Sequence, residues 1–187
     1  MTCIIAVEAV DNNGNDVVVM AGDHLGSNGF TKNIVTQPKV FSHSGIVFGY
    51  TTSFRFGQLI EHCLDNNELM LPPKENTYKW LVKQFVPELK SILKDNDYTS
   101  GGNALVGING QLWEIQNDFS VLKHDIGFGS VGSGTYHAEA AILTWSKLEL
   151  NGKKPNVSEV EVMLDHVFET VSTFVTSVSS KYSYVVL

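Results

Sequence analysis

The sequence predicts an α+β fold in which two antiparallel sheets stack face to face and a pair of helices covers each outer face, a four-layer αββα sandwich. Two observations support it. Strand-like and helix-like apolar patterns follow one another in the order strands, two helices, strands, two helices, strand. Every predicted helix carries one apolar stripe, and the sandwich buries all of these stripes. With 187 residues, 43% of them hydrophobic, the chain is expected to form one domain, 1–187, with a sizeable core.

A buried β-hairpin is predicted at the start of the chain. Residues 3–10 are almost wholly apolar, residues 11–16 are rich in Asp, Asn and Gly, and residues 17–21 form a second apolar run before Asp23. The antiparallel return of such a hairpin carries Asp23 back towards Thr2 if the loop is short. A strand that begins at the third residue also fixes the position of Thr2 in the fold.

Two short strands and a helix are predicted next. Residues 24–38 are polar and contain glycine, whereas residues 39–42 and 46–50 read as strands around a Ser-Gly turn. The polar side chains at 51–53 can cap a helix, and apolar residues then recur at helical spacing. We therefore expect a first helix from about Ser53 to Asn66.

A second helix and a three-stranded unit fill the middle of the chain. Apolar residues at helical spacing between 78 and 93 predict the helix, which Pro87 should kink or split because proline lacks an N–H. Residues 103–109 and 111–116 flank a glycine and predict a hairpin. Residues 119–123 predict a third strand beside it.

The last part of the chain predicts two helices and a final strand. The glycine-rich run 127–132 leads into a helix from about Tyr136 to Leu150. This run matches the spacing of a dinucleotide-binding loop, but no βαβ unit surrounds it, so such binding is not expected. Apolar residues between 160 and 178 give the clearest helical face in the chain, and residues 182–187 read as a strand.

Composition narrows the function classes. A net charge of −7 without a basic cluster argues against nucleic acid and anionic membranes as main partners. No segment reads as a signal peptide or a membrane span, and Cys3 and Cys63 read as reduced core residues, so a cytoplasmic location is expected. The histidines and cysteines show no metal-ligand spacing, and neither a metal nor a cofactor is expected.

Thr2 is the first candidate functional residue. Its small side chain should permit removal of Met1, which would leave a hydroxyl and a free α-amine on one residue. An N-terminal amine has an ordinary pKa of roughly 7.7–8.0 and can activate a threonine hydroxyl as a nucleophile. The alternative is an inert, frayed terminus, which is the commoner fate of a Met-Thr start.

A set of short motifs spread over most of the chain resembles the N-terminal-nucleophile hydrolases of the proteasome β/HslV family. The motifs are Thr2-Cys3-Ile4-Ile5, Ala21-Gly22-Asp23, Lys39-Val40 and Gly132-Ser133-Gly134. Each motif is weak by itself, and their order and spacing carry the resemblance. It implies the same four-layer sandwich and a threonine-type endopeptidase that cuts unfolded polypeptide inside a ring-shaped chamber.

The resemblance also implies roles for single residues. Asp23 would orient Lys39, and Lys39 would lie buried beside Thr2 and ease removal of the hydroxyl proton. The hydroxyl of Ser133 would join a network with the terminal amine. Each residue has a simpler interpretation as well, because Asp23 can close a turn, Lys39 can be a solvated strand residue and Ser133 can cap a helix.

Two other parts of the implied site depart from the family pattern. Glu169 and Ser172 stand where the family has an aspartate and a serine near the amine, and Asp165 one turn earlier could substitute for Glu169. Thr51 and Thr52 stand where the family has a Gly-Gly-Thr-like turn, whose backbone N–H would meet the oxyanion at the start of the first helix.

The resemblance implies partners too. We expect self-association into two stacked rings of six subunits, polypeptide substrates and an ATP-dependent unfoldase, since the nucleophile directly follows Met1 without the propeptide of many proteasome β subunits. Two other functions remain open from the sequence. One is a small-molecule N-terminal-nucleophile amidase, and the other is a catalytically silent ring or scaffold subunit.

Overall fold

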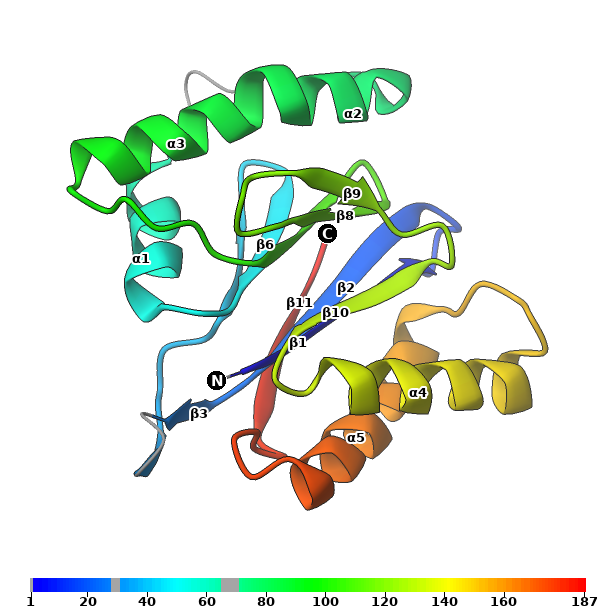
Figure 1. Cartoon of the computed structure of the whole chain (residues 1–187). Coiled ribbons are helices and arrows are strands. Elements are labelled where there is room, and N and C mark those ends of the chain that lie inside the picture. Colours follow the sequence, from blue (N-terminus) through cyan, green and yellow to red (C-terminus); the bar gives the residue numbers. More distant parts are fainter. Residues whose placement is uncertain (1, 28–30, 65–70) are drawn as a thin grey trace.

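Two sheets lie face to face at the centre of the structure, and helices cover both outer faces (Figure 1). The structure is a computed structural model and describes residues 2–27, 31–64 and 71–187. One sheet has the strand order β10-β1-β2-β11 and the other has the order β5-β6-β7-β8-β9, with every neighbouring pair antiparallel. The predicted α+β four-layer sandwich is confirmed.

The first sheet contains the chain's opening hairpin and its final strand. It consists of β1 (Cys3–Val10), β2 (Asp16–Asp23), β10 (Phe128–Gly132) and β11 (Tyr182–Val186). The second sheet consists of β5 (Val40–His43), β6 (Ile46–Tyr50), β7 (Ala104–Ile108), β8 (Gln111–Ile115) and β9 (Val121–Lys123). A separate hairpin, β3 (Leu25–Ser27) and β4 (Lys32–Ile34), extends from the end of β2.

The helices divide between the two outer faces. The second sheet is covered by α1 (Phe54–Cys63), α2 (Thr77–Trp80) and α3 (Val86–Asp95), with a 3₁₀ turn at Lys74–Asn76 and a π-helical stretch at Leu81–Phe85. The first sheet is covered by α4 (Thr135–Trp145), which continues as a π-helical stretch at Ser146–Leu150, and by α5 (Val157–Phe174). The predicted end of the first helix, Asn66, lies outside the described residues.

Three layers of apolar side chains lie between the four layers of secondary structure and hold them together. Ile4, Met20 and Val47 belong to the layer between the two sheets. A second layer joins the first sheet to α4 and α5 and includes Phe168, and a third joins the second sheet to α1 and α3 and includes Phe56. Because β1 and β2 contribute side chains to two of these layers, both strands are buried along most of their length.

Several boundaries differ from the sequence prediction. The glycine-rich run before α4 is a strand, β10, because pairing with β1 supplies the strand geometry that glycine itself does not favour. The polar connection after β2 contains the β3–β4 hairpin. The last helix ends at Phe174, before the predicted end at Val178.

Pro87 lies at the start of α3, inside a run of residues that is helical from Thr77 to Asp95, and it lacks the N–H that such a helix would use. The π-helical stretch Leu81–Phe85 comes directly before it. The predicted split at Pro87 therefore does not occur: the helix type changes just before Pro87, and the chain stays helical from Thr77 to Asp95.

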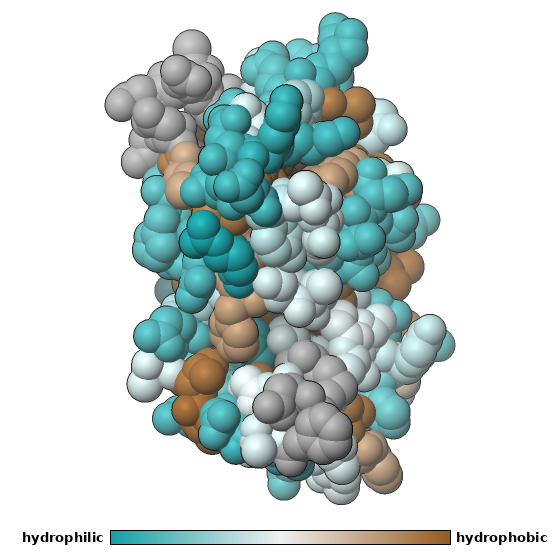
Figure 2. All heavy atoms as spheres, turned by 60° about the vertical axis from the view of Figure 1, so that its left-hand side comes forward, coloured by the Kyte–Doolittle hydropathy of each residue, from teal (hydrophilic) through white to brown (hydrophobic). Residues whose placement is uncertain are grey.

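The outer surface contrasts with these apolar layers. On the face that Figure 2 shows, hydrophilic residues predominate and hydrophobic ones are scattered among them, as is usual for a protein surface. Within the described parts of the chain, no helix combines the length and the apolar character that crossing a membrane would need.

Candidate functional site

The opening hairpin brings Thr2 and Asp23 together. In its register Ile4 pairs with Gly22, so Asp23 lies opposite the start of β1. The backbone N–H of Cys3 donates to Oδ1 of Asp23 at 2.9 Å. Thr2 is only 5% exposed and Asp23 is fully buried. Thr2 is therefore held by the fold, as the hairpin predicted, and is not frayed.

Lys39 is the buried partner of Asp23. Its side chain is 1% exposed, and its Nζ donates to Asp23 Oδ1 at 2.8 Å and to the Leu25 carbonyl oxygen at 2.7 Å. Burial lowers the pKa of Lys39, and the Asp23 carboxylate opposes that shift. An ammonium has three N–H donors, and its two contacts among the described residues leave one donor for the pocket that Lys39 and Thr2 share.

Asp23 is a well-satisfied buried carboxylate. In addition to Cys3 and Lys39, the backbone N–H groups of Leu25 and Ser179 donate to its Oδ2 at 3.1 and 3.2 Å. Hydrogen bonds of this kind stabilise a buried charge that would otherwise be costly. Asp23 thus joins the start of β1, the β2–β3 turn and the loop before β11, and it fixes the position of Lys39.

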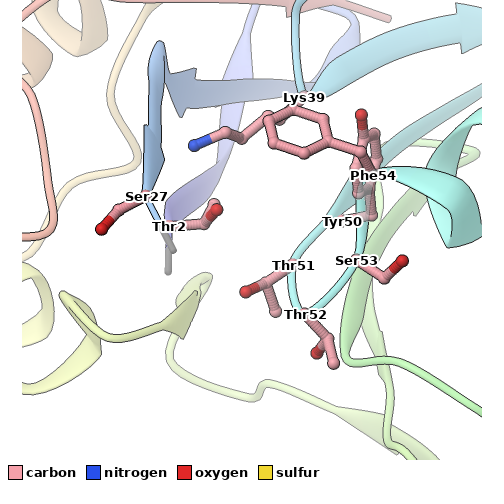
Figure 3. Close-up of a pocket in the computed structure, with 8 residues that line it drawn as sticks. All are labelled: Thr2, Ser27, Lys39, Tyr50, Thr51, Thr52, Ser53 and Phe54. Carbon is pink, nitrogen blue, oxygen red and sulfur yellow. The ribbon is translucent and has the colours of Figure 1, made fainter. Parts of the chain in front are cut away.

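Thr2 and Lys39 open onto one small pocket (Figure 3). Its other walls come from β3 and from the segment that connects β6 to α1. These lining residues are Ser27, Tyr50, Thr51, Thr52, Ser53 and Phe54. The pocket therefore combines one buried cation, several hydroxyl groups and two aromatic rings beside the candidate nucleophile.

A strained turn at Thr52 forms one wall of this pocket. Thr52 has a φ of 80°, and the N–H of Ser53 donates to the Thr51 carbonyl oxygen at 3.0 Å, which makes a γ-turn. The N–H of Thr51 donates to the Asn103 carbonyl oxygen at 3.0 Å. Among the described residues, the Thr52 N–H has no such partner, so it is the free backbone donor before α1.

Replacing Thr52 with glycine should relieve this strain. A β-branched residue at positive φ is an outlier, and such strain costs about 1–3 kcal/mol. Part of the gain is offset because glycine gives the unfolded chain more freedom, so we expect Thr52→Gly to raise the free energy of unfolding by about 1 kcal/mol. Urea denaturation measures this free energy of unfolding. Thr51→Gly is the control and should destabilise the protein, since Thr51 is buried and has no positive φ.

Ser133 contacts the backbone of Thr2. Its Oγ donates to the Thr2 carbonyl oxygen at 3.3 Å and shares a hydrogen bond of 2.9 Å with the Oγ of Ser177. The approach depends on Gly132, which has a φ of 110° and where a Cβ would collide with the Thr2 carbonyl oxygen. The Ser133 side chain therefore contacts the backbone of Thr2, the predicted nucleophile, and Ser177 holds that side chain in place.

The structure does not bring Glu169, Ser172 or Asp165 to Thr2. On α5 the neighbouring residues Val167 and Phe168 take the buried face, so Glu169 points outward and is exposed. The Ser172 hydroxyl donates to the Glu169 carbonyl oxygen of its own helix at 3.0 Å. Asp165 accepts from the Tyr182 hydroxyl at 2.6 Å. Within the described part of the chain, no hydrogen bond or ion pair links these side chains to the pocket.

Several residues of the site were not predicted. Ser177, in the loop between α5 and β11, shares a hydrogen bond with Ser133, whereas the serine expected near the amine was Ser172. The apolar spacing suggested a helix through Val178 and concealed this loop; the serine-rich run 177–180 before the last strand was the available signal. Tyr50 and Phe54 read as strand and helix residues, and nothing in their spacing marked them as pocket walls.

Comparisons with known proteins support the fold. No protein-family model and no curated protein sequence matches the chain. HslV from Trypanosoma brucei is similar in structure, with a TM-score of 0.67 and 17% identity over 100% of this chain and 99% of that chain.

Two further solved structures are similar. BPH from Thiobacillus denitrificans has a TM-score of 0.72 and 13% identity over 98% of this chain and 97% of that chain. Anbu, the ancestral beta-subunit, from Yersinia bercovieri has a TM-score of 0.68 and 13% identity over 100% of this chain and 82% of that chain. Identities this low support conclusions about fold alone. The chain therefore has the N-terminal-nucleophile hydrolase fold of HslV and of the proteasome-like β subunits.

Proposed function

We propose that the protein is a threonine endopeptidase in which Thr2, freed by removal of Met1, is the nucleophile. The observation that carries this proposal is the shared pocket of Thr2 and Lys39, with Lys39 held by the buried Asp23 at 2.8 Å. A buried ammonium beside the hydroxyl of Thr2 favours loss of the hydroxyl proton. Met1 itself lies outside the described residues.

The reaction would proceed through an ester of Thr2. The Oγ1 of Thr2 bonds to the scissile carbonyl carbon while its proton passes to the α-amine of the same residue. The carbon–nitrogen bond of the peptide then breaks, and the amine returns the proton to the leaving group. Water next attacks the ester, which releases a carboxylic acid and restores the Thr2 hydroxyl.

The surrounding groups have separate tasks in this scheme. The remaining N–H of Lys39 would stabilise the negative charge that develops on Oγ1, since both residues line one pocket. The free N–H of Thr52, the residue before the N-cap Ser53 of α1, would donate to the oxyanion, and the positive end of the helix dipole lies nearby. Ser133 and Ser177 hold the Thr2 backbone. Glu169 has no part in the scheme.

Hydrolysis of short fluorogenic peptides by protein of known N-terminus tests the proposal. Intact mass shows whether the chain begins at Met1 or at Thr2. Protein that begins at Thr2 should hydrolyse the peptides, whereas protein that retains Met1 should not, because its Thr2 nitrogen is an amide and cannot act as a base. Hydrolysis at equal rates by both forms would contradict the mechanism.

We also propose an enclosed assembly in the cytoplasm. A peptidase with an open site would cut flexible loops of other proteins, and a chamber built of two stacked hexameric rings would prevent this. The structural likeness to HslV supports the proposal, as does a net charge that does not favour nucleic acid or membrane partners. An ATP-driven unfoldase would then be needed to deliver folded substrates.

Native mass spectrometry should show a homo-oligomer of twelve subunits at micromolar concentration. Folded proteins should be degraded only when the unfoldase and ATP are added, whereas short peptides should be cut without them, since they can diffuse into the chamber. A stable monomer with full peptidase activity would contradict the chamber and favour a small-molecule amidase.

A further inference from the structure

We propose that Phe54 makes this enzyme selective for small side chains at the acyl residue, the residue that supplies the scissile carbonyl. The inference rests on the proposed function, because it assumes that Thr2 attacks that carbonyl. Three observations carry it: the size of the pocket, the place of the pocket relative to Thr2 and Thr52, and the packing that fixes the Phe54 ring.

The pocket is too small for a large side chain. Its volume is about 70 Å³. A protein cavity of about 150 Å³ is known to accommodate benzene, so half of that volume cannot take a phenyl ring. A methyl or hydroxymethyl group fits, whereas the side chains of leucine and phenylalanine do not fit wholly inside this space.

The chemistry places the acyl side chain in this pocket. The carbonyl carbon must lie against Thr2 Oγ1, and its oxygen must face the Thr2–Thr52 side where the free N–H lies. The α-carbon is one bond from that carbonyl carbon, so its side chain enters the space that Thr2, Lys39 and Phe54 enclose (Figure 3). The same three residues therefore decide which side chains can approach.

Phe54 is the wall that limits the volume. As the first residue of α1, it has a ring held edge-on against the Tyr50 ring at 6.4 Å and under the Lys39 ammonium at 5.9 Å. Close packing also supports it from β3, because a Cβ at Gly26 would lie 3.7 Å from the ring. The ring is 36% exposed, and a swing away from this place would lose both the attraction to the cation and the contact with Tyr50.

The other two large walls are more deeply buried than Phe54. Tyr50 is 2% exposed, and its ring lies so close to Gly57 that a side chain there would overlap it. Lys39 is held by Asp23 and by the Leu25 carbonyl oxygen. The hydroxyl side chains of Thr51 and Ser53 make the remaining lining polar. The acyl residues that suit this space are alanine and serine.

Phe54→Ala tests the inference with peptides that differ only at the acyl residue. For protein that begins at Thr2, kcat/KM for alanine and serine peptides should exceed that for leucine and phenylalanine peptides by at least about tenfold, as pocket size alone can discriminate. In the Phe54→Ala protein, kcat/KM for the leucine and phenylalanine peptides should rise by about tenfold or more. Tyr78→Ala is the matched control, since this ring lies on α2, is 56% exposed and lines none of this pocket.

The outcomes separate this inference from the proposed function. If wild-type protein cuts leucine and phenylalanine peptides as well as alanine peptides, in a manner that Thr2→Ala abolishes, the selectivity is wrong and the peptidase stands. The selectivity is also wrong if Phe54→Ala cuts with an unchanged preference. If no acyl residue is cut by wild-type protein or by Phe54→Ala in a Thr2-dependent way, both proposals fail.

Discussion

Thr2→Ala is expected to abolish peptide hydrolysis, with a loss of several orders of magnitude in kcat. The substitution removes the Oγ1 that forms the ester, and no other hydroxyl in the pocket carries its own N-terminal amine. Thr2→Ser should retain part of the activity, because it keeps both the hydroxyl and the amine. The measurement is the rate of fluorogenic peptide hydrolysis by protein whose mass shows that residue 2 is the first residue.

The fold should survive this change. The Thr2 backbone stays in place through the Ser133 contact, and the Cys3 N–H still donates to Asp23. Thr144→Ala is the matched control, since Thr144 is an exposed threonine on α4 whose hydroxyl donates to the carbonyl oxygen of Ala140. Circular dichroism and native mass should be the same for all of these proteins. Undiminished hydrolysis by Thr2→Ala would eliminate Thr2 as the nucleophile.

The core of the candidate site could be predicted from the sequence because local pattern determines it. Two apolar runs around a short turn define a hairpin, and the hairpin sets Thr2 beside Asp23 whatever the rest of the chain does. Lys39 follows because a buried lysine needs an acidic partner, and the nearest buried acid is Asp23. Here the resemblance and the residue chemistry lead to the same group of three side chains.

The acidic residue near the amine could not be predicted in the same way. Glu169 was chosen by its place along the chain, but on a helix the position relative to the apolar stripe decides which way a side chain points. Phe168 is buried, so its successor is turned outward by about 100° and faces away from the first sheet. Helical periodicity on α5 could have excluded Glu169; only the end of that helix at Phe174 places Ser177.

Strand β10 was missed for a different reason. Glycine has low strand propensity, so the glycine-rich run looked like a loop before a helix. Its extended form comes from pairing with β1, a contact between segments more than 100 residues apart. The glycines are needed there because Gly132 lets the chain pass the Thr2 carbonyl oxygen closely. The same residues that concealed the strand therefore make the contact with Thr2 possible.

Lys39→Ala should reduce peptide hydrolysis by orders of magnitude. The ammonium stabilises charge on Oγ1 in a site that excludes most water. One such interaction lowers the activation free energy by about 3–4 kcal/mol. Lys39→Arg should not restore the activity, because a guanidinium is wider and the enclosed Lys39 position is 1% exposed. The rates are measured with the same fluorogenic peptides, at a temperature at which circular dichroism shows a folded protein.

The stability cost of this change must be separated from the catalytic cost. Removing Lys39 leaves the Asp23 carboxylate buried without its cation, which should lower the free energy of unfolding by about 3–5 kcal/mol. Lys74→Ala is the matched control, because Lys74 also pairs with an aspartate, Asp16, at 2.6 Å, but its side chain is 50% exposed. Lys74→Ala should lower the free energy of unfolding by about 0–1 kcal/mol and leave peptide hydrolysis unchanged.

The pH dependence of peptide hydrolysis tests the role of Lys39 without a mutation. Hydrolysis should rise as the terminal amine loses its proton, near its ordinary pKa of roughly 7.7–8.0. Burial lowers the pKa of Lys39, so its ammonium is lost at a lower pH than that of a solvated lysine, whose pKa is about 10.4. The rate should therefore fall again on the alkaline side before ordinary lysines titrate. A folded Lys39→Ala protein that hydrolyses peptides at the wild-type rate, with the same alkaline limb, would show that the Lys39 charge has no part in the reaction.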